Sequence, residues 1–132
     1  MPHLQFEINK CVNNVTKQKF VIFIEKSFSR IMQTGTDHIA ISVREYEKEN
    51  LSLGRANKSD HVCLMNLDIR IGRSKEQKIE LIKTFVTGVE KFFNIKKVNQ
   101  YVTLTNHPGN EFNFYEKSLQ NWVKDDDPNN QF

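Results

Sequence analysis

Long apolar runs are missing from this sequence of 132 residues. The longest apolar cluster spans residues 20–24 and is flanked by Lys19 and Glu25, whereas a membrane-spanning helix needs about 20 apolar residues. The start of the sequence also lacks the charged and apolar regions of a secretory signal peptide. We therefore expect a cytoplasmic protein with no membrane partner.

Cysteine is scarce, and so are patterns that would bind a metal. Cys11 and Cys63 are too few for a cysteine-rich zinc site, and without a secretory signal we expect no disulfide. The histidines are His3, His38, His61 and His107. They show no short-range spacing typical of metal ligands. We therefore predict no metal site and expect structural roles for all of them.

An excess of one charge is also missing. The 19 basic and 16 acidic residues are interspersed and give a net charge of +3. Because nucleic-acid-binding domains usually carry a concentrated basic stripe, we expect no nucleic-acid partner. An apolar content of 38% is too high for a disordered chain, and the length suits one domain. We place that domain at residues 1–120 and a polar tail at residues 121–132.

What the sequence does contain is hydrophobic periodicity, which begins with a strand–helix–strand unit. Residues 2–9 alternate between apolar and polar, which is typical of a half-buried strand. Apolar spacing over residues 15–33 predicts a helix, with an N-cap near Asn13 and Gly35 at its carboxyl end. Residues 38–46 alternate again and predict a second strand.

The same order repeats after a polar loop at residues 47–60. Residues 61–71 predict a long, mostly buried strand. Ser74 with Gln77 three residues later is a capping-box pattern that opens a second helix. Residues 99–105 predict the last strand of this unit.

Two such units predict an α/β fold with a four-stranded sheet and both helices on one face. Strands joined through a helix are parallel neighbours with a right-handed crossover. The strand at residues 61–71 reads as apolar on both faces. We therefore expect the second sheet face to be buried against other copies of the chain, as a homo-oligomer.

Pro2 is the first candidate for chemistry. A methionine that precedes a small residue such as proline is normally removed after synthesis, which would leave a secondary amine at the new terminus. Burial and neighbouring cations lower the pKa of an amine, and a base with a pKa near neutral suits proton abstraction. The alternative is that Pro2 merely begins an edge strand, where its missing backbone donor costs nothing.

Three arginines are candidates for binding anions. Arg73 lies between the third strand and the second helix, where strand ends and helix N-terminal amides favour acidic ligands. Arg70 lies three residues earlier on the strand itself, and Arg44 lies near the end of the second strand. The alternative for each is a solvated surface charge.

Together these features resemble the tautomerase superfamily, and most of all its 5-carboxymethyl-2-hydroxymuconate isomerase branch. The resemblance is carried by Met1-Pro2-His3, the strand-to-helix run Leu67–Ser74, and His107-Pro108 followed by Asn113-Phe114. It covers residues 1–120 and implies a tautomerase-like fold of tandem β-α-β units. It also implies a homotrimer that works without a cofactor or metal.

The resemblance also implies roles for individual residues. The amino-terminal proline of the family is its general base and acid, a role that falls on Pro2. An arginine before the second helix holds a substrate carboxylate, and Arg73 matches it. A second arginine lies on the second strand, where Arg44 is the match and Ser42 is the alternative in a shifted register.

Two positions depart from the family or its branches. Arg70 adds a charge where the isomerase branch tends to have a small residue, and we expect it to bind substrate. Arg70 and Arg73 reproduce the Arg-x-x-Arg pair of the haloacrylate dehalogenases. That branch also needs a carboxylate where this chain has Phe114, so dehalogenation is disfavoured. Phe114 is expected instead to form an apolar wall that keeps the Pro2 amine neutral.

The predicted function is that of an isomerase that moves a proton in an unsaturated 2-hydroxy or 2-oxo dicarboxylic acid, such as 5-carboxymethyl-2-hydroxymuconate. Two alternatives stay open. The run Arg-Ser-x-Glu-Gln-Lys at residues 73–78 and the position of Asp37 are similar to malonate semialdehyde decarboxylase. The other alternative is a non-enzymatic interaction protein on the same fold.

Overall fold

Both halves of the chain form the predicted strand–helix–strand units in the computed structural model, which describes residues 2–118. The main elements are β1 (His3–Ile8), α1 (Asn14–Met32), β2 (Ala40–Glu45), β3 (Cys63–Arg70), α2 (Lys75–Phe93) and β4 (Gln100–His107). The shorter ones are η1 (Lys48–Asn50), η2 (Lys97–Asn99), η3 (Gly109–Glu111), β5 (Asn113–Phe114) and β6 (Lys117–Ser118). The predicted tail at residues 121–132 lies outside the described residues. Within residues 2–118, neither helix is long and apolar enough to cross a membrane.

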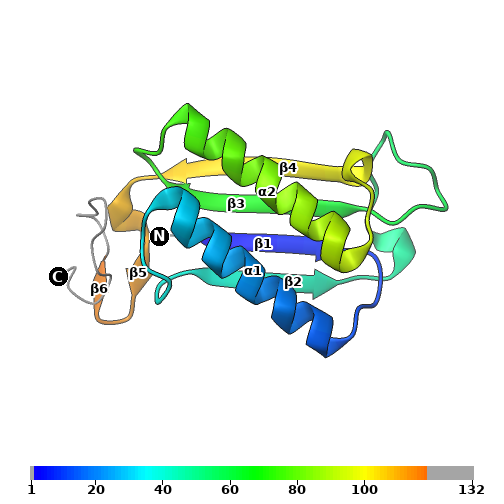
Figure 1. Ribbon diagram of the computed structural model, residues 1–132, viewed down its shortest axis with the longest axis horizontal. Coiled ribbons are helices and arrows are strands. Elements are labelled where there is room, and N and C mark those ends of the chain that lie inside the picture. The colour runs from blue at the N-terminus through cyan, green and yellow to red at the C-terminus, as the bar shows by residue number, and fades with distance from the viewer. Residues whose placement is uncertain (1, 119–132) are drawn as a thin grey trace.

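The four long strands form one sheet in the order β2-β1-β3-β4, and both helices cover the same face of it (Figure 1). β1 is parallel to β2, and β3 is parallel to β4, whereas β1 and β3 are antiparallel. The predicted architecture is therefore confirmed. Since β1 is an interior strand, the alternative that Pro2 begins an edge strand is wrong.

Local capping explains where the helices begin and end. The Asn13 side chain accepts a hydrogen bond of 2.8 Å from the Thr16 amide and so starts α1. Ser74 and Gln77 form the predicted capping box at the start of α2. The expectation for Gly35 is wrong, because α1 ends at Met32 and Gln33 takes the left-handed position with φ of 54°.

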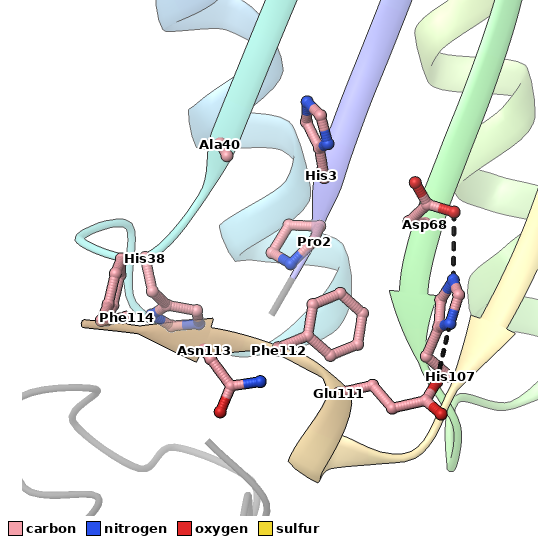
Figure 2. A pocket seen from close by; sticks show the side chains of 10 residues that line it. All are labelled: Pro2, His3, His38, Ala40, Asp68, His107, Glu111, Phe112, Asn113 and Phe114. Atoms are coloured by element: carbon pink, nitrogen blue, oxygen red, sulfur yellow. Dashed lines mark hydrogen bonds and ion pairs between the residues drawn. The ribbon is translucent and has the colours of Figure 1, made fainter. Parts of the chain in front are cut away.

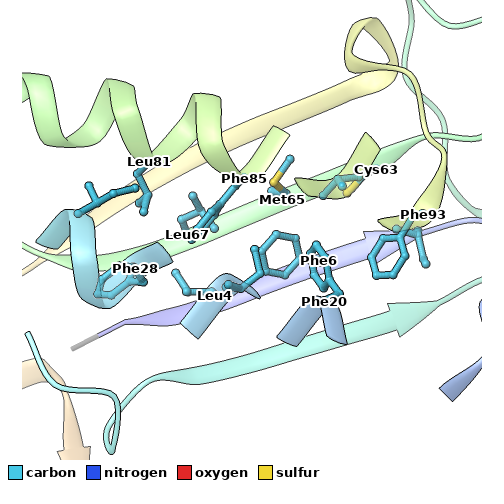
Figure 3. Packing of buried hydrophobic residues seen from close by; sticks show 14 of the residues in the cluster. Leu4, Phe6, Phe20, Phe28, Cys63, Met65, Leu67, Leu81, Phe85 and Phe93 are labelled. Carbon is cyan, nitrogen blue, oxygen red and sulfur yellow. The ribbon is translucent and has the colours of Figure 1, made fainter. Parts of the chain in front are cut away.

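The core lies between the sheet and the helices and is rich in phenylalanine (Figure 3). The Phe6 ring on β1 meets the Phe20 ring of α1 edge-on, with centroids 5.0 Å apart. The Phe20 ring in turn lies 4.3 Å from that of Phe93 on α2. Fully burying each such ring stabilises the fold by about 1.5–3 kcal/mol, so this cluster holds the helices onto the sheet.

The other face of the sheet is polar, which corrects one expectation. Buried and half-buried residues alternate along β3, and its second face carries Asn66, Asp68 and Arg70 after Leu64. Gln5 of β1 donates a hydrogen bond of 3.2 Å to Asp68 across this face. The strand is therefore apolar on one face only. An apolar second face cannot be the reason for oligomer formation.

Candidate functional site

A pocket of about 400 Å³ opens at one end of the sheet (Figure 2). It is lined by Pro2, His3, His38, Ala40, Asp68, His107, Glu111, Phe112, Asn113 and Phe114. The strand directions explain this set, because the amino ends of β1 and β2 meet the carboxyl ends of β3 and β4 here. The volume suits a small-molecule ligand.

Pro2 lies at the start of β1, inside this pocket (Figure 2). It is buried, and its carbonyl accepts a hydrogen bond of 3.2 Å from the Ala40 amide, which fixes the backbone there. Residue 1 lies outside the described residues. Burial disfavours the charged form of an amine, so this position suits a terminal amine that must be neutral to act as a base.

A charged cluster forms the opposite wall. The Nε2 atom of His107 lies 3.1 Å from Asp68 Oδ1, and its Nδ1 atom lies 3.0 Å from Glu111 Oε1 (Figure 2). A neutral imidazole has one N–H, so both nitrogens can donate only in the imidazolium form. Hydrogen bonds to Asp68 and then to Glu111 raise the pKa of His107 above its usual value.

Two aromatic side chains from the segment after β4 also line the pocket. The Phe112 ring meets the His107 ring edge-on, with centroids 5.5 Å apart and an angle of 87° between the ring planes. Phe114 lies in β5 and is 43% exposed. The structure thus brings Phe114 into the same pocket as Pro2. Its predicted role as an apolar wall stays a prediction.

Histidines are the pocket-lining residues that the sequence did not single out. His3, His38 and His107 line the pocket, although structural roles were expected for them. His38 is buried, and its Nε2 atom lies 3.4 Å from Thr34 Oγ1. The available signal was positional, because each of the three lies near a strand end, but only the antiparallel pairing of β1 and β3 brings those ends to the same edge of the sheet.

Arg73 lies away from these lining residues. Its side chain is buried beneath the carboxyl end of α1, where Nη1 donates a hydrogen bond of 2.9 Å to the Met32 carbonyl. Burial, and then repulsion from Arg70, lower the pKa of Arg73 to about 10. The structure therefore gives Arg73 a contact with the helix end, and its predicted role as a carboxylate clamp stays a prediction.

The other predicted binding residues lie on the polar sheet face. Arg44 donates a hydrogen bond of 3.3 Å to Gln5 and lies 3.9 Å from the Glu7 carboxylate. Ser42, the strand partner of Gln5, is half-buried. Arg70 ends β3, and burial lowers its pKa. Their roles in substrate binding stay predictions.

Charge in the pocket is distributed differently from the expectation. In the described part of the chain, the lining includes two carboxylates, Asp68 and Glu111, and no lysine or arginine. When His107 is protonated, its imidazolium offsets one of these negative charges. Among residues 2–118, no group of three or more histidine, cysteine or acidic side chains is placed to hold a metal ion.

Arg70 is a cation that the sheet places beside this cluster. It is the strand partner of His107 in the parallel pair of β3 and β4, and it projects from the same face of β3 as Asp68. A guanidinium is a planar donor that suits a carboxylate. Of the predicted anion-binding residues, Arg70 therefore has the position most compatible with a ligand that extends beyond the pocket.

Solved structures share this arrangement of strands and helices at low sequence identity. Macrophage migration inhibitory factor of Toxoplasma gondii superposes with a TM-score of 0.77 at 12% identity, covering 88% of this chain and 98% of that one. FG41 malonate semialdehyde decarboxylase gives 0.72 at 7% identity, covering 85% and 88%. A symmetric trimer of fused 4-OT gives 0.72 at 17% identity, covering 80% and 85%. No protein-family model matches the chain, and no curated protein matches its sequence.

These likenesses show the fold. The four-stranded mixed sheet with two helices on one face is the tautomerase and migration-inhibitory-factor fold, as the sequence predicted. At identities of 7–17%, the neighbours do not transfer an activity to this chain. Function has to be argued from the pocket.

Proposed function

We propose that this chain is an enzyme of the tautomerase superfamily that uses the amine of Pro2, freed by removal of Met1, as a general base and acid. The observation that carries the proposal is the buried position of Pro2 in a pocket of about 400 Å³ on this fold. Solved neighbours that include tautomerase-fold enzymes support the reaction class. We further propose that its activity is that of the 5-carboxymethyl-2-hydroxymuconate isomerase branch.

In the proposed reaction, the lone pair of the neutral Pro2 amine takes a proton from a dienol hydroxyl or from a carbon beside a carbonyl. The electrons move into the conjugated system, and negative charge develops on the carbonyl side. The proline ammonium then returns the proton to a different carbon, so the substrate is isomerised with no net change in protons. Burial of Pro2 favours the neutral amine with which the cycle begins.

The proposed substrate is an unsaturated 2-hydroxy or 2-oxo dicarboxylic acid, such as 5-carboxymethyl-2-hydroxymuconate. Its carboxylates need cations, and we propose Arg70 and Arg73, with Arg44 or Ser42 at the far end. Arg70 has the best support, because it is the strand partner of His107 in the pocket wall. Arg73 has the weakest, because its guanidinium binds the Met32 carbonyl.

We also propose that the chain works as a homotrimer in the cytoplasm. The neighbours include a symmetric trimer of fused 4-OT, which supports a trimeric arrangement on this fold. In the sheet of the described residues, β2 and β4 are edge strands with backbone groups that a second copy could pair with. Sedimentation or light scattering tests the assembly directly.

The experiment that tests the function is ultraviolet-monitored conversion of a 2-hydroxymuconate dienol. The amino terminus is first checked by intact mass, because the amine exists only when Met1 is removed. We expect rapid conversion that falls by about a hundredfold or more in Pro2→Ala, since general base catalysis contributes about 10²–10⁴-fold. Unchanged turnover in that variant, with its fold intact by circular dichroism, would contradict the proposal.

The same protein preparation, with its amino terminus verified, also tests the two alternative functions. Release of carbon dioxide from malonate semialdehyde, with no dienol conversion, would favour the decarboxylase. The malonate semialdehyde decarboxylase structures among the neighbours motivate that assay. Failure of both reactions with a verified free Pro2 would favour a non-enzymatic interaction protein.

A further inference from the structure

The segment that follows β4 forms one wall of the Pro2 pocket through Glu111, Phe112, Asn113 and Phe114. Among residues 2–118, its backbone hydrogen bonds stay local. The Glu111 amide donates to the Pro108 carbonyl at 3.0 Å, and the Phe112 amide donates to the Gly109 carbonyl at 3.2 Å. The wall therefore needs a side-chain link to keep a fixed distance from Pro2.

His107 provides that link. Within residues 2–118, the hydrogen bond from His107 to Glu111 joins a side chain of this segment to the sheet, and the hydrogen bond to Asp68 anchors His107 on β3. Asp68 is held in turn by Gln5 at 3.2 Å and Asn66 at 3.4 Å. The chain of contacts thus runs from the interior strands to the wall.

We propose that Asp68, His107 and Glu111 form a charged clamp that holds residues 109–114 as the wall of the Pro2 pocket, with His107 as a positioning residue for substrate binding. The effect on substrate rests on the proposed function, whereas the clamp itself does not. His107 does not react with substrate, because both of its nitrogens are directed at carboxylates. The edge-on contact with Phe112 couples the His107 ring to the apolar part of the wall.

The clamp depends on pH through His107. The charged and titratable groups around it are Asp68 and Arg70 of β3, Glu111 of η3, and His3, the β1 partner of Asp68. Because the pKa of His107 is raised in the folded protein, the clamp is complete below about pH 6.5 and is lost as the pH rises through that raised pKa. A neutral imidazole would then turn a lone pair toward one of the two carboxylates.

Glu111→Gln is the most informative variant, because it removes one charge of the clamp and keeps the length of an exposed side chain. His61→Gln is its control, since His61 binds the Asn9 carbonyl and lies outside the pocket lining. At pH 6 we expect the amides of Glu111 and Phe112 to exchange hydrogen about twofold to fivefold faster in the position-111 variant than in the wild type. The His61 variant should match the wild type.

Nuclear magnetic resonance titration gives a second readout that is independent of activity. The pKa of His107 should be lower in Glu111→Gln than in the wild type, because one stabilising carboxylate has been removed. Unchanged exchange of the two amides, together with an unchanged His107 pKa, would overturn the clamp. The exchange and titration measurements test the clamp whether or not Pro2 is catalytic.

Kinetics then test the consequence for substrate. With the 2-hydroxymuconate dienol at pH 6, KM should rise about twofold to fivefold in Glu111→Gln, and kcat should change less than KM. The difference in KM between variant and wild type should vanish above the His107 pKa. An equal KM at pH 6 despite faster amide exchange would overturn the positioning role, whereas inactivity of the wild type would refute the proposed function and leave the exchange test of the clamp intact.

Discussion

Replacing Arg73 by methionine separates its structural contact from its predicted catalytic role. A pKa of about 10 in place of 12.5 means that burial, and then repulsion from Arg70, together disfavour the charged guanidinium by about 3 kcal/mol. Its hydrogen bond to the Met32 carbonyl returns about 1.5–3 kcal/mol, as expected for a charged donor. Its position at the carboxyl end of α1 adds about 0.3–1 kcal/mol through the helix dipole.

These terms nearly cancel, so Arg73→Met should change the free energy of unfolding by about 1 kcal/mol or less. Methionine keeps the apolar volume of the arginine stem. It removes both the cost of burying a charge and the gain from the hydrogen bond and the helix dipole. Arg73→Ala should cost about 2 kcal/mol more, because truncation also leaves a cavity beside the buried core. Urea unfolding at pH 7 measures both variants.

Kinetics on the same pair decide the function of Arg73. If Arg73 holds a substrate carboxylate, both variants lose kcat/KM to a similar extent in spite of their different stabilities. If it serves only the helix end, Arg73→Met keeps kcat/KM within about twofold of the wild type. A loss of more than about 3 kcal/mol of stability in Arg73→Met would refute the near-cancellation of cost and gain at the Arg73 guanidinium.

Two further predictions concern groups outside the pocket. The pKa of Glu45 is lowered by hydrogen bonds from Lys17 and a backbone amide, so Glu45→Gln should lower stability by up to about 1 kcal/mol at pH 7. Urea unfolding should show that loss disappear as the pH falls below the pKa of Glu45, and an equal loss at acid pH would contradict it. Burial raises the pKa of Cys63 to about 12, whereas Cys11 is exposed. Ellman's reagent should therefore modify one thiol in the folded protein and two in urea, and rapid reaction of both in buffer would contradict this.

The secondary structure was predictable because its signals are local. The capping box of Ser74 and Gln77 and the N-cap at Asn13 involve residues within one turn of each other. The error at Gly35 has a local cause too, because Gln33 adopted the left-handed conformation that usually favours glycine. The order strand–helix–strand, repeated twice, then predicted a four-stranded sheet with both helices on one face, because such units form parallel strand pairs with right-handed crossovers.

The candidate site was predictable only in part. Pro2 and Phe114, two residues far apart in sequence, were expected near each other from the family resemblance, and one pocket contains both. No arginine is among the described residues that line the pocket, and Arg73 donates a hydrogen bond to the Met32 carbonyl at the end of α1, so the binding roles of the arginines stay predictions. Sequence position could place Arg73 between a strand and a helix but could not give the direction of its side chain.

Periodicity and capping along the chain thus determine the strands, the helices and the residues that face the core, because each depends on neighbours a few positions away. The pocket depends instead on strand register. Antiparallel pairing sets His3 beside Asp68, and parallel pairing sets His107 beside Arg70. A shift of one residue would turn each side chain to the opposite face of the sheet. Only the tertiary structure could therefore bring His107 between two carboxylates at the wall of the Pro2 pocket.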